Sequence, residues 1–273
     1  MRPEQRIIFW REWYIHRGKT CSSPDPGNSL HQSSVSLQIP VAPEKKIRAF
    51  EQRHLKVPKS ARYAIMGSLE AELSEVWIVC HGHGQLARRF LSRFLPLERS
   101  DRLFIAPEAL SRFYLSPPQG GPHAPDTPVG ASWMTAEDRD LEMQDYVGYL
   151  DLLHDEIFSV VDRAKVRLWV LGFSQGTATA ARWVARGKVD PDRVVLYAGL
   201  LPSELDMEHA ARLARRSPLT IVLGTNDEFA KPELIAAQEA RLRELRVPHT
   251  TIRFEGGHEI TPDVLLRLTE ETG

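Results

Sequence analysis

From about residue 50 onward, short apolar runs rich in β-branched residues alternate with longer segments of helical period. Their near-continuous hydrophobicity is typical of strands buried on both faces of a parallel sheet, and the intervening segments predict crossover helices on both faces. The chain is therefore expected to have an α/β fold with a mostly parallel central sheet. The runs lie at residues 61–66, 76–80, 103–106, 166–173, 194–200, 219–223 and 250–254.

The sequence predicts two of the expected helices in detail. Within residues 135–161 the apolar positions keep a spacing of three to four, and Thr135, Asp138 and Asp140 provide an acidic start that can cap a helix. Residues 231–246 place a proline near the first turn and an arginine at the end, which suits the two ends of a helix dipole.

The charge and cysteine content exclude several classes of protein. The charges of the 35 basic and 36 acidic residues nearly cancel, so the net charge provides no sequence-independent attraction to a nucleic-acid backbone. The longest apolar run, residues 194–201, is far shorter than the roughly 20 residues that cross a bilayer as a helix. With only Cys21 and Cys80 and a charged N-terminus, the chain is expected to be cytoplasmic, with no nucleic-acid partner and no membrane span.

The motif that carries chemistry is Gly172-Phe173-Ser174-Gln175-Gly176, which follows one predicted strand and opens a predicted helix. A Gly-x-Ser-x-Gly pattern alone occurs by chance in about one chain in ten of this length, so its context decides. A strand–turn–helix context is what a nucleophile elbow requires, because the serine sits on a sharp turn that only small neighbours allow.

The partners that such a serine needs follow it in the expected order. Asp227 comes just after the predicted strand at 219–223, and His258 comes just after the last predicted strand. An early strand ends in the loop 81–85, whose small residues let a backbone N–H approach a substrate carbonyl.

The segments HGHGQ, GFSQG, GTND and GGHEI, in this order, resemble the α/β-hydrolase fold and specifically the phospholipase/carboxylesterase family, which includes the acyl-protein thioesterases. The likeness covers roughly residues 55–273. It implies that Ser174 is the nucleophile, Asp227 the acid and His258 the base. It further implies an oxyanion hole made by the backbone N–H groups of His83 and Gln175.

The chain departs from the family pattern near the expected oxyanion hole. The family usually has an apolar residue at position 83, an acidic one at 85 and often a glycine at 177, where this chain has His83, Gln85 and Thr177. These departures concern the shape of the hole and of the acyl pocket, and leave the three triad positions intact.

Rival interpretations of these residues are weaker. Glu228 is the alternative acid, but it lies one residue further on and should point away. His81 and His83 have the spacing that begins some zinc motifs, yet their glycine neighbours fit an oxyanion loop better, so neither a metal nor an organic cofactor is expected. Arg212, Arg215 and Arg216 are expected on a solvated helix face.

The long segment 107–134 joins a strand to the first long helix and contains several apolar residues. Segments of this length without regular structure are usually functional in compact domains, so we expect it to form the mouth of the active site. The expected substrate-pocket residues are Phe113, Tyr114, Leu115, Trp133 and Met134.

Together these features predict a serine esterase that cleaves small ester or thioester substrates with short to medium acyl chains, similar to a carboxylesterase or lysophospholipase. An acyltransferase, a lactonase, a peptidase and a non-catalytic ligand-binding module on the same scaffold stay open as alternatives, as does a homodimer. The predicted division is an N-terminal extension at 1–54, partly disordered, and a hydrolase domain at 55–273 without a separate lid domain. The extension either begins with an amphipathic helix or reflects a misassigned start codon.

Overall fold

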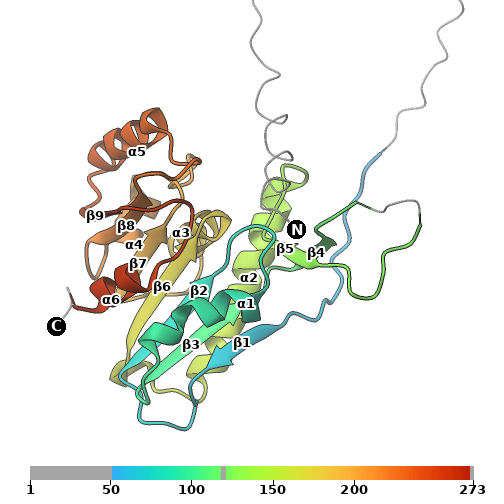
Figure 1. The fold of residues 1–273 in the computed structure, drawn as a ribbon, viewed down its shortest axis with the longest axis horizontal. Helices are drawn as coiled ribbons and strands as arrows, with labels where there is room; N and C mark the ends of the chain where they lie inside the picture. Colours follow the sequence, from blue (N-terminus) through green and yellow to red (C-terminus); the bar gives the residue numbers. More distant parts are fainter. Residues whose placement is uncertain (1–50, 118–120, 271–273) are drawn as a thin grey trace, which may run out of the picture. The chain divides into compact units, whose positions relative to one another are not determined.

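The computed structural model describes residues 51–117 and 121–270, and its centre is a seven-stranded sheet in the order β1-β3-β2-β6-β7-β8-β9 (Figure 1). Strand β1 pairs antiparallel with β3, and all the other neighbours in this sheet pair in parallel. The strands are β1 (Tyr63–Met66), β2 (Glu75–Cys80), β3 (Arg102–Pro107), β6 (Arg167–Phe173), β7 (Arg193–Tyr197), β8 (Leu219–Gly224) and β9 (His249–Phe254).

Helices cover both faces of this sheet, and two apolar clusters divide the core accordingly. One cluster joins the side chains of Val76, Ile78 and Val170 to those of the helices α2 and α3. The other lies on the opposite face, where Trp77 and Trp169 stack with ring centroids 4.1 Å apart beneath α1 and α6. The helices are α1 (Ala87–Leu91), α2 (Arg139–Phe158), α3 (Gln175–Arg186), α4 (Met207–Leu213), α5 (Pro232–Glu244) and α6 (Pro262–Glu270), with 3₁₀ turns η3 (Ser92–Leu97) and η4 (Arg163–Lys165).

The alternation of strands and helices is confirmed, and each of the seven predicted strands is present with ends shifted by a few residues at most. The predicted segment 107–134 differs from expectation, because it contains a hairpin. Strands β4 (Ser111–Tyr114) and β5 (Val129–Ser132) pair antiparallel as a separate two-stranded sheet. A backbone bridge between Gln85 and Ala131 attaches this hairpin to the loop that follows β2.

The start of α2 also differs from the sequence pattern. The helix begins at Arg139, and Asp138 adopts a left-handed conformation with a φ of 46° and no side-chain capping bond. Thr135 still contributes, because its backbone N–H donates to the Glu142 carboxylate in the first turn. The first turn is acidic as predicted, with Asp140 and Glu142, but no side chain caps it at Asp138.

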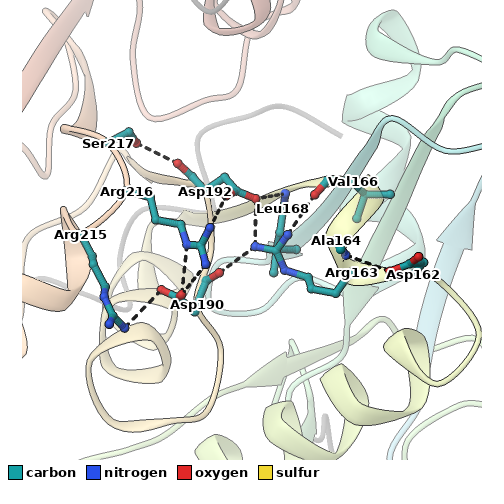
Figure 2. A network of polar contacts seen from close by, with 10 residues as sticks. All are labelled: Asp162, Arg163, Ala164, Val166, Leu168, Asp190, Asp192, Arg215, Arg216 and Ser217. Atoms are coloured by element: carbon teal, nitrogen blue, oxygen red, sulfur yellow. Dashed lines mark hydrogen bonds and ion pairs between the residues drawn. The ribbon is translucent and has the colours of Figure 1, made fainter.

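A network of ion pairs joins the amino ends of β6, β7 and β8, and Figure 2 shows its members. Asp192 accepts hydrogen bonds from Arg163 at 2.9 Å and from Arg216 at 3.1 Å, and also from the backbone N–H of Leu168 at 2.8 Å. Arg216 also donates to Asp190, and Arg215 lies 3.7 Å from the same carboxylate. Because α4 ends at Leu213, Arg215 and Arg216 lie beyond the helix on which they were expected.

Of the predicted N-terminal extension, only residues 51–54 are among the described residues, so its predicted character stays a prediction. Within residues 51–117 and 121–270, no helix has both the length and the apolar composition that crossing a membrane requires.

Candidate active site

Ser174 lies on a sharp turn between β6 and α3. Its backbone has a φ of 54° and a ψ of −118°, a conformation that residues with a side chain rarely adopt. The turn approaches β2 so closely that a Cβ on Gly176 would collide with the carbonyl oxygens of Cys80 and His81. This geometry gives the glycine of the motif its physical reason and places the Ser174 hydroxyl at the carboxyl edge of the sheet.

The structure brings Ser174, His258 and Asp227 into one hydrogen-bonded chain. The Nε2 atom of His258 lies 2.8 Å from the Oγ atom of Ser174, and its Nδ1 atom lies 2.9 Å from Oδ2 of Asp227. The Asp227 side chain is only 1% exposed and the His258 side chain 20%. A proton on Nδ1 that is donated to the buried carboxylate leaves Nε2 free to accept the serine proton.

Two aromatic rings hold the His258 imidazole. Phe173 contacts it with ring centroids 5.1 Å apart, and Phe229 contacts it edge-on at 4.7 Å. The backbone N–H of Phe229 also donates to the second carboxylate oxygen of Asp227 at 2.9 Å, so both oxygens of this acid are occupied. Glu228, the rival acid, is exposed.

The loop after β2 is shaped by its own side chains. Gln85 accepts the N–H of Gly82 through Oε1 at 2.8 Å and closes the turn. His81 is fully buried, and its ring joins the Gly82 carbonyl at 2.7 Å to the N–H of Ala109 at 3.0 Å. Burial lowers the pKa of His81 to about 4, so this imidazole is neutral near pH 7 and holds the loop in place.

His83 and Gln175, the residues expected to supply the oxyanion hole, lie on the loop after β2 and at the first position of α3. The first N–H groups of a helix have no acceptor within it, so helix geometry leaves the N–H of Gln175 without an intrahelical partner. The His83 ring stacks on Phe113 with centroids 5.0 Å apart, and its Nδ1 atom lies 3.2 Å from Oγ of Ser132. Desolvation by these neighbours lowers the pKa of His83, although the residue as a whole stays exposed.

Thr177, at the position where the resemblance led us to expect glycine, ties the elbow to the neighbouring strand. Its hydroxyl lies 3.0 Å from the carbonyl of Gly172 and 3.1 Å from that of Tyr197. The Thr177 side chain is fully buried, and Gly199 leaves room for it, since a Cβ there would lie 2.5 Å from the Thr177 hydroxyl.

The expected pocket residues fall into two groups. Phe113, Tyr114 and Leu115 lie at the end of β4, where Tyr114 and Leu115 are exposed, and Leu115 lies close to Gly84 of the loop after β2. Trp133 and Met134 are instead buried in the core cluster beneath the hairpin. The indole N–H of Trp133 donates to the carbonyl of His81 at 2.8 Å.

Sequence reasoning missed the contacts made by Ser132 and by the aromatic residues around His258, because these depend on how the hairpin and the strand ends meet in space. Among residues 51–117 and 121–270, no group of three or more histidine, cysteine or acidic side chains is arranged to hold a metal ion.

Comparison with solved structures identifies the fold. The structure of Zea mays acyl-protein thioesterase 2 superposes with a TM-score of 0.57 at 20% identity, covering 78% of this chain and all of that one. The Bacillus cereus carboxylesterase gives 0.55 at 16% identity over 77% and 92% of the two chains, and esterase PE8 gives 0.55 at 19% over 77% and 97%. The chain has the α/β-hydrolase fold.

At the level of sequence, no family model matches the chain. No curated protein matches it either. The similarity to esterases and thioesterases is therefore one of structure.

Proposed function

We propose that this protein is a serine hydrolase that cleaves carboxylic esters or thioesters through an acyl-enzyme on Ser174. The observation that carries the proposal is the hydrogen-bonded chain from Ser174 Oγ through His258 to the buried Asp227, on the strained turn of an α/β-hydrolase fold. A serine next to a histidine that is itself oriented by a carboxylate has the geometry of an activated nucleophile.

In the proposed mechanism, His258 Nε2 takes the proton of Ser174 as Oγ forms a bond to the substrate carbonyl carbon. The carbonyl π electrons move to its oxygen, where the N–H groups of His83 and Gln175 stabilise the negative charge. The bond to the leaving group then breaks, and the alcohol or thiol departs with the proton from His258. Water repeats the sequence on the acyl-enzyme and releases the carboxylic acid.

The surroundings of the triad support a small, acyl-bearing substrate. Phe113 stacks on His83, Leu115 lies close to Gly84 of the loop after β2, and Phe229 contacts His258. These residues and Tyr114 offer apolar surface, and three of the four are exposed. The structural neighbours include a carboxylesterase and an acyl-protein thioesterase, which favours esters and thioesters over peptides.

Labelling by a fluorophosphonate probe tests the nucleophile directly. The wild-type protein should form one covalent adduct by intact mass, and the Ser174→Ala variant should form none. Ser92→Ala, an exposed serine on η3, serves as the matched control and should label like wild type. Labelling of the Ser174→Ala protein, or none of the wild type, would contradict the proposal.

A chain-length series of p-nitrophenyl esters, measured beside a lysophospholipid and an acyl thioester, then defines the substrate. We expect the highest kcat/KM for short to medium acyl chains. Product analysis with added alcohols or thiols distinguishes hydrolysis from acyl transfer, because a transferase would yield the new ester in place of the free acid.

A further inference from the structure

Ser132, at the end of β5, lies between the two residues expected to supply the oxyanion hole. Its Oγ atom is 3.2 Å from Nδ1 of His83 and 3.1 Å from Nε2 of Gln175. The side chain is only 3% exposed. We propose that Ser132 is a positioning residue that fixes the spacing between the His83 and Gln175 backbone N–H groups. This inference rests on the proposed function.

The side-chain polar groups of Ser132 and Gln175 all find hydrogen-bond partners within this small network. Its hydroxyl donates to the carbonyl of Met134 at 3.0 Å, so its oxygen is left to accept from Gln175 and from His83. The Gln175 amide also donates to the Met134 carbonyl at 2.9 Å and accepts the N–H of Trp133 at 3.1 Å. The Gln175 side chain is thus held at three points by residues 132–134.

The backbone of the hairpin holds the other side of the hole. The N–H of Gly84 donates to the Ala131 carbonyl at 2.8 Å, and the N–H of Ala131 donates to the Gln85 carbonyl at 3.2 Å. The two backbones approach so closely that a Cβ on Gly130 would collide with Gly84. Segment 130–134 therefore joins the loop after β2 to the first turn of α3.

This connection matters because an oxyanion hole acts through its geometry. The two N–H groups come from segments far apart in the chain, and both must point at the place where negative charge develops. A misplacement of about 1 Å can cost about 100-fold in rate. Loss of the Ser132 hydroxyl leaves both N–H groups present, and Gln175 keeps its bonds to Trp133 and Met134, but the side-chain connection from Gln175 to His83 is broken.

The test replaces Ser132 with alanine and measures ester hydrolysis together with inhibition by a boronic acid, which forms a tetrahedral adduct on the nucleophile. We expect kcat to fall about 10-fold with KM nearly unchanged, and the boronic acid to bind about 10-fold more weakly. The matched control is Ser111→Ala, which lies directly opposite Ser132 in the hairpin register. Among the described residues the Ser111 hydroxyl has no hydrogen-bond partner, so this variant should behave like wild type.

Three outcomes would overturn the inference. They are wild-type kcat in Ser132→Ala, a loss confined to KM, and an equal loss in Ser111→Ala. If Ser132→Ala does not fold, Gln175→Leu removes all three hydrogen bonds between this side chain and residues 132–134, including the one to Ser132, while it keeps the backbone N–H. It should show a parallel loss of kcat and adduct affinity at least as large as that expected for Ser132→Ala. Failure of the proposed function looks different, because the wild-type protein itself would then show neither hydrolysis nor boronic acid binding.

Discussion

The two ends of the strands β6, β7 and β8 are built on different principles. At their carboxyl ends, Ser174 and Ala198 have φ values of 54° and 51°, and close backbone contacts and a buried carboxylate hold the site. At their amino ends, arginine and aspartate side chains pair across the gaps between strands (Figure 2). The same strands thus end in steric constraint on one edge and in charge pairing on the other.

The difference shows what each edge can tolerate. Charge pairs at partly exposed positions contribute little individually and accept rearrangement, whereas a strained turn persists only where its surroundings leave no alternative. Ligands of open α/β sheets bind outside the carboxyl ends of the strands, which is where the strained edge lies. We therefore expect substitutions at the carboxyl edge to change rate and those at the amino edge to change stability.

The largest expected effect is on rate at the carboxyl edge. Asp227→Asn removes the acceptor that holds the His258 proton on Nδ1, and kcat should fall by about 10⁴-fold through the wrong tautomer. Steady-state hydrolysis and thermal unfolding, measured together, should show this loss with little change in Tm. A large fall in Tm would mean that Asp227 also stabilises the fold. It would contradict the expectation that substitutions at the carboxyl edge change the rate and leave stability nearly unchanged.

The next effect concerns stability in acid, and it arises at His81, the first residue of the loop after β2. The unfolded chain protonates this imidazole below its ordinary pKa of about 6.5, but the folded protein does so only near pH 4. The unfolded state binds more protons in between, so His81 costs the protein up to about 3 kcal/mol of stability as the pH falls from 6.5 to 4.

Urea unfolding from pH 7.5 to 4.5 measures this effect by difference. His81→Gln keeps the hydrogen-bonding capacity without the titration, so the stability gap between wild type and variant should close as the pH falls. Parallel profiles for the two proteins would show that His81 does not titrate differently on folding.

A smaller loss of stability is expected at the amino edge. Asp192→Ala leaves the N–H of Leu168 and the guanidinium of Arg163 without this acceptor, at a cost of about 2 kcal/mol. Activity at a permissive temperature should equal that of wild type. A fall in kcat/KM without a fall in stability would reverse the expected roles of the two edges.

The smallest effect is expected at Arg216, whose side chain is 46% exposed. Its hydrogen bond lowers the pKa of Asp190, but exposed pairs of this kind contribute only about 0–1 kcal/mol. Arg216→Gln should lower stability within this range, and the difference should disappear at about 1 M salt, where charges are screened within about 3 Å. An undiminished difference in high salt would mean that Arg216 acts through packing.

The sequence was sufficient for the parts of the fold that follow from local pattern. The buried strands show as continuous apolar runs, and the positions of Ser174, Asp227 and His258 follow from where those runs end. These three side chains were expected in one site because the carboxyl ends of parallel strands meet at one edge, and the structure does bring them together. Their chemical roles stay a prediction.

The hairpin could not be predicted in the same way. Strands β4 and β5 have four residues each, are separated by a long proline-containing connection, and show no clear alternation. Their pairing is completed by the bridge between Gln85 and Ala131, which joins distant parts of the chain. The contacts of Ser132, and the burial of Trp133 and Met134, depend on that docking and have no local signal.

The reactivity of Cys80 can report how often the core of the sheet unfolds locally. Its thiol is fully buried at the end of β2, beneath the elbow, and burial raises its pKa to about 12. Alkylating reagents attack the thiolate, so in the native state both access and ionisation protect this sulfur. In a Cys21→Ser background, Cys80 is the remaining cysteine. The rate at which iodoacetamide modifies it would therefore measure how often the centre of the sheet is exposed to solvent, without any added dye or label.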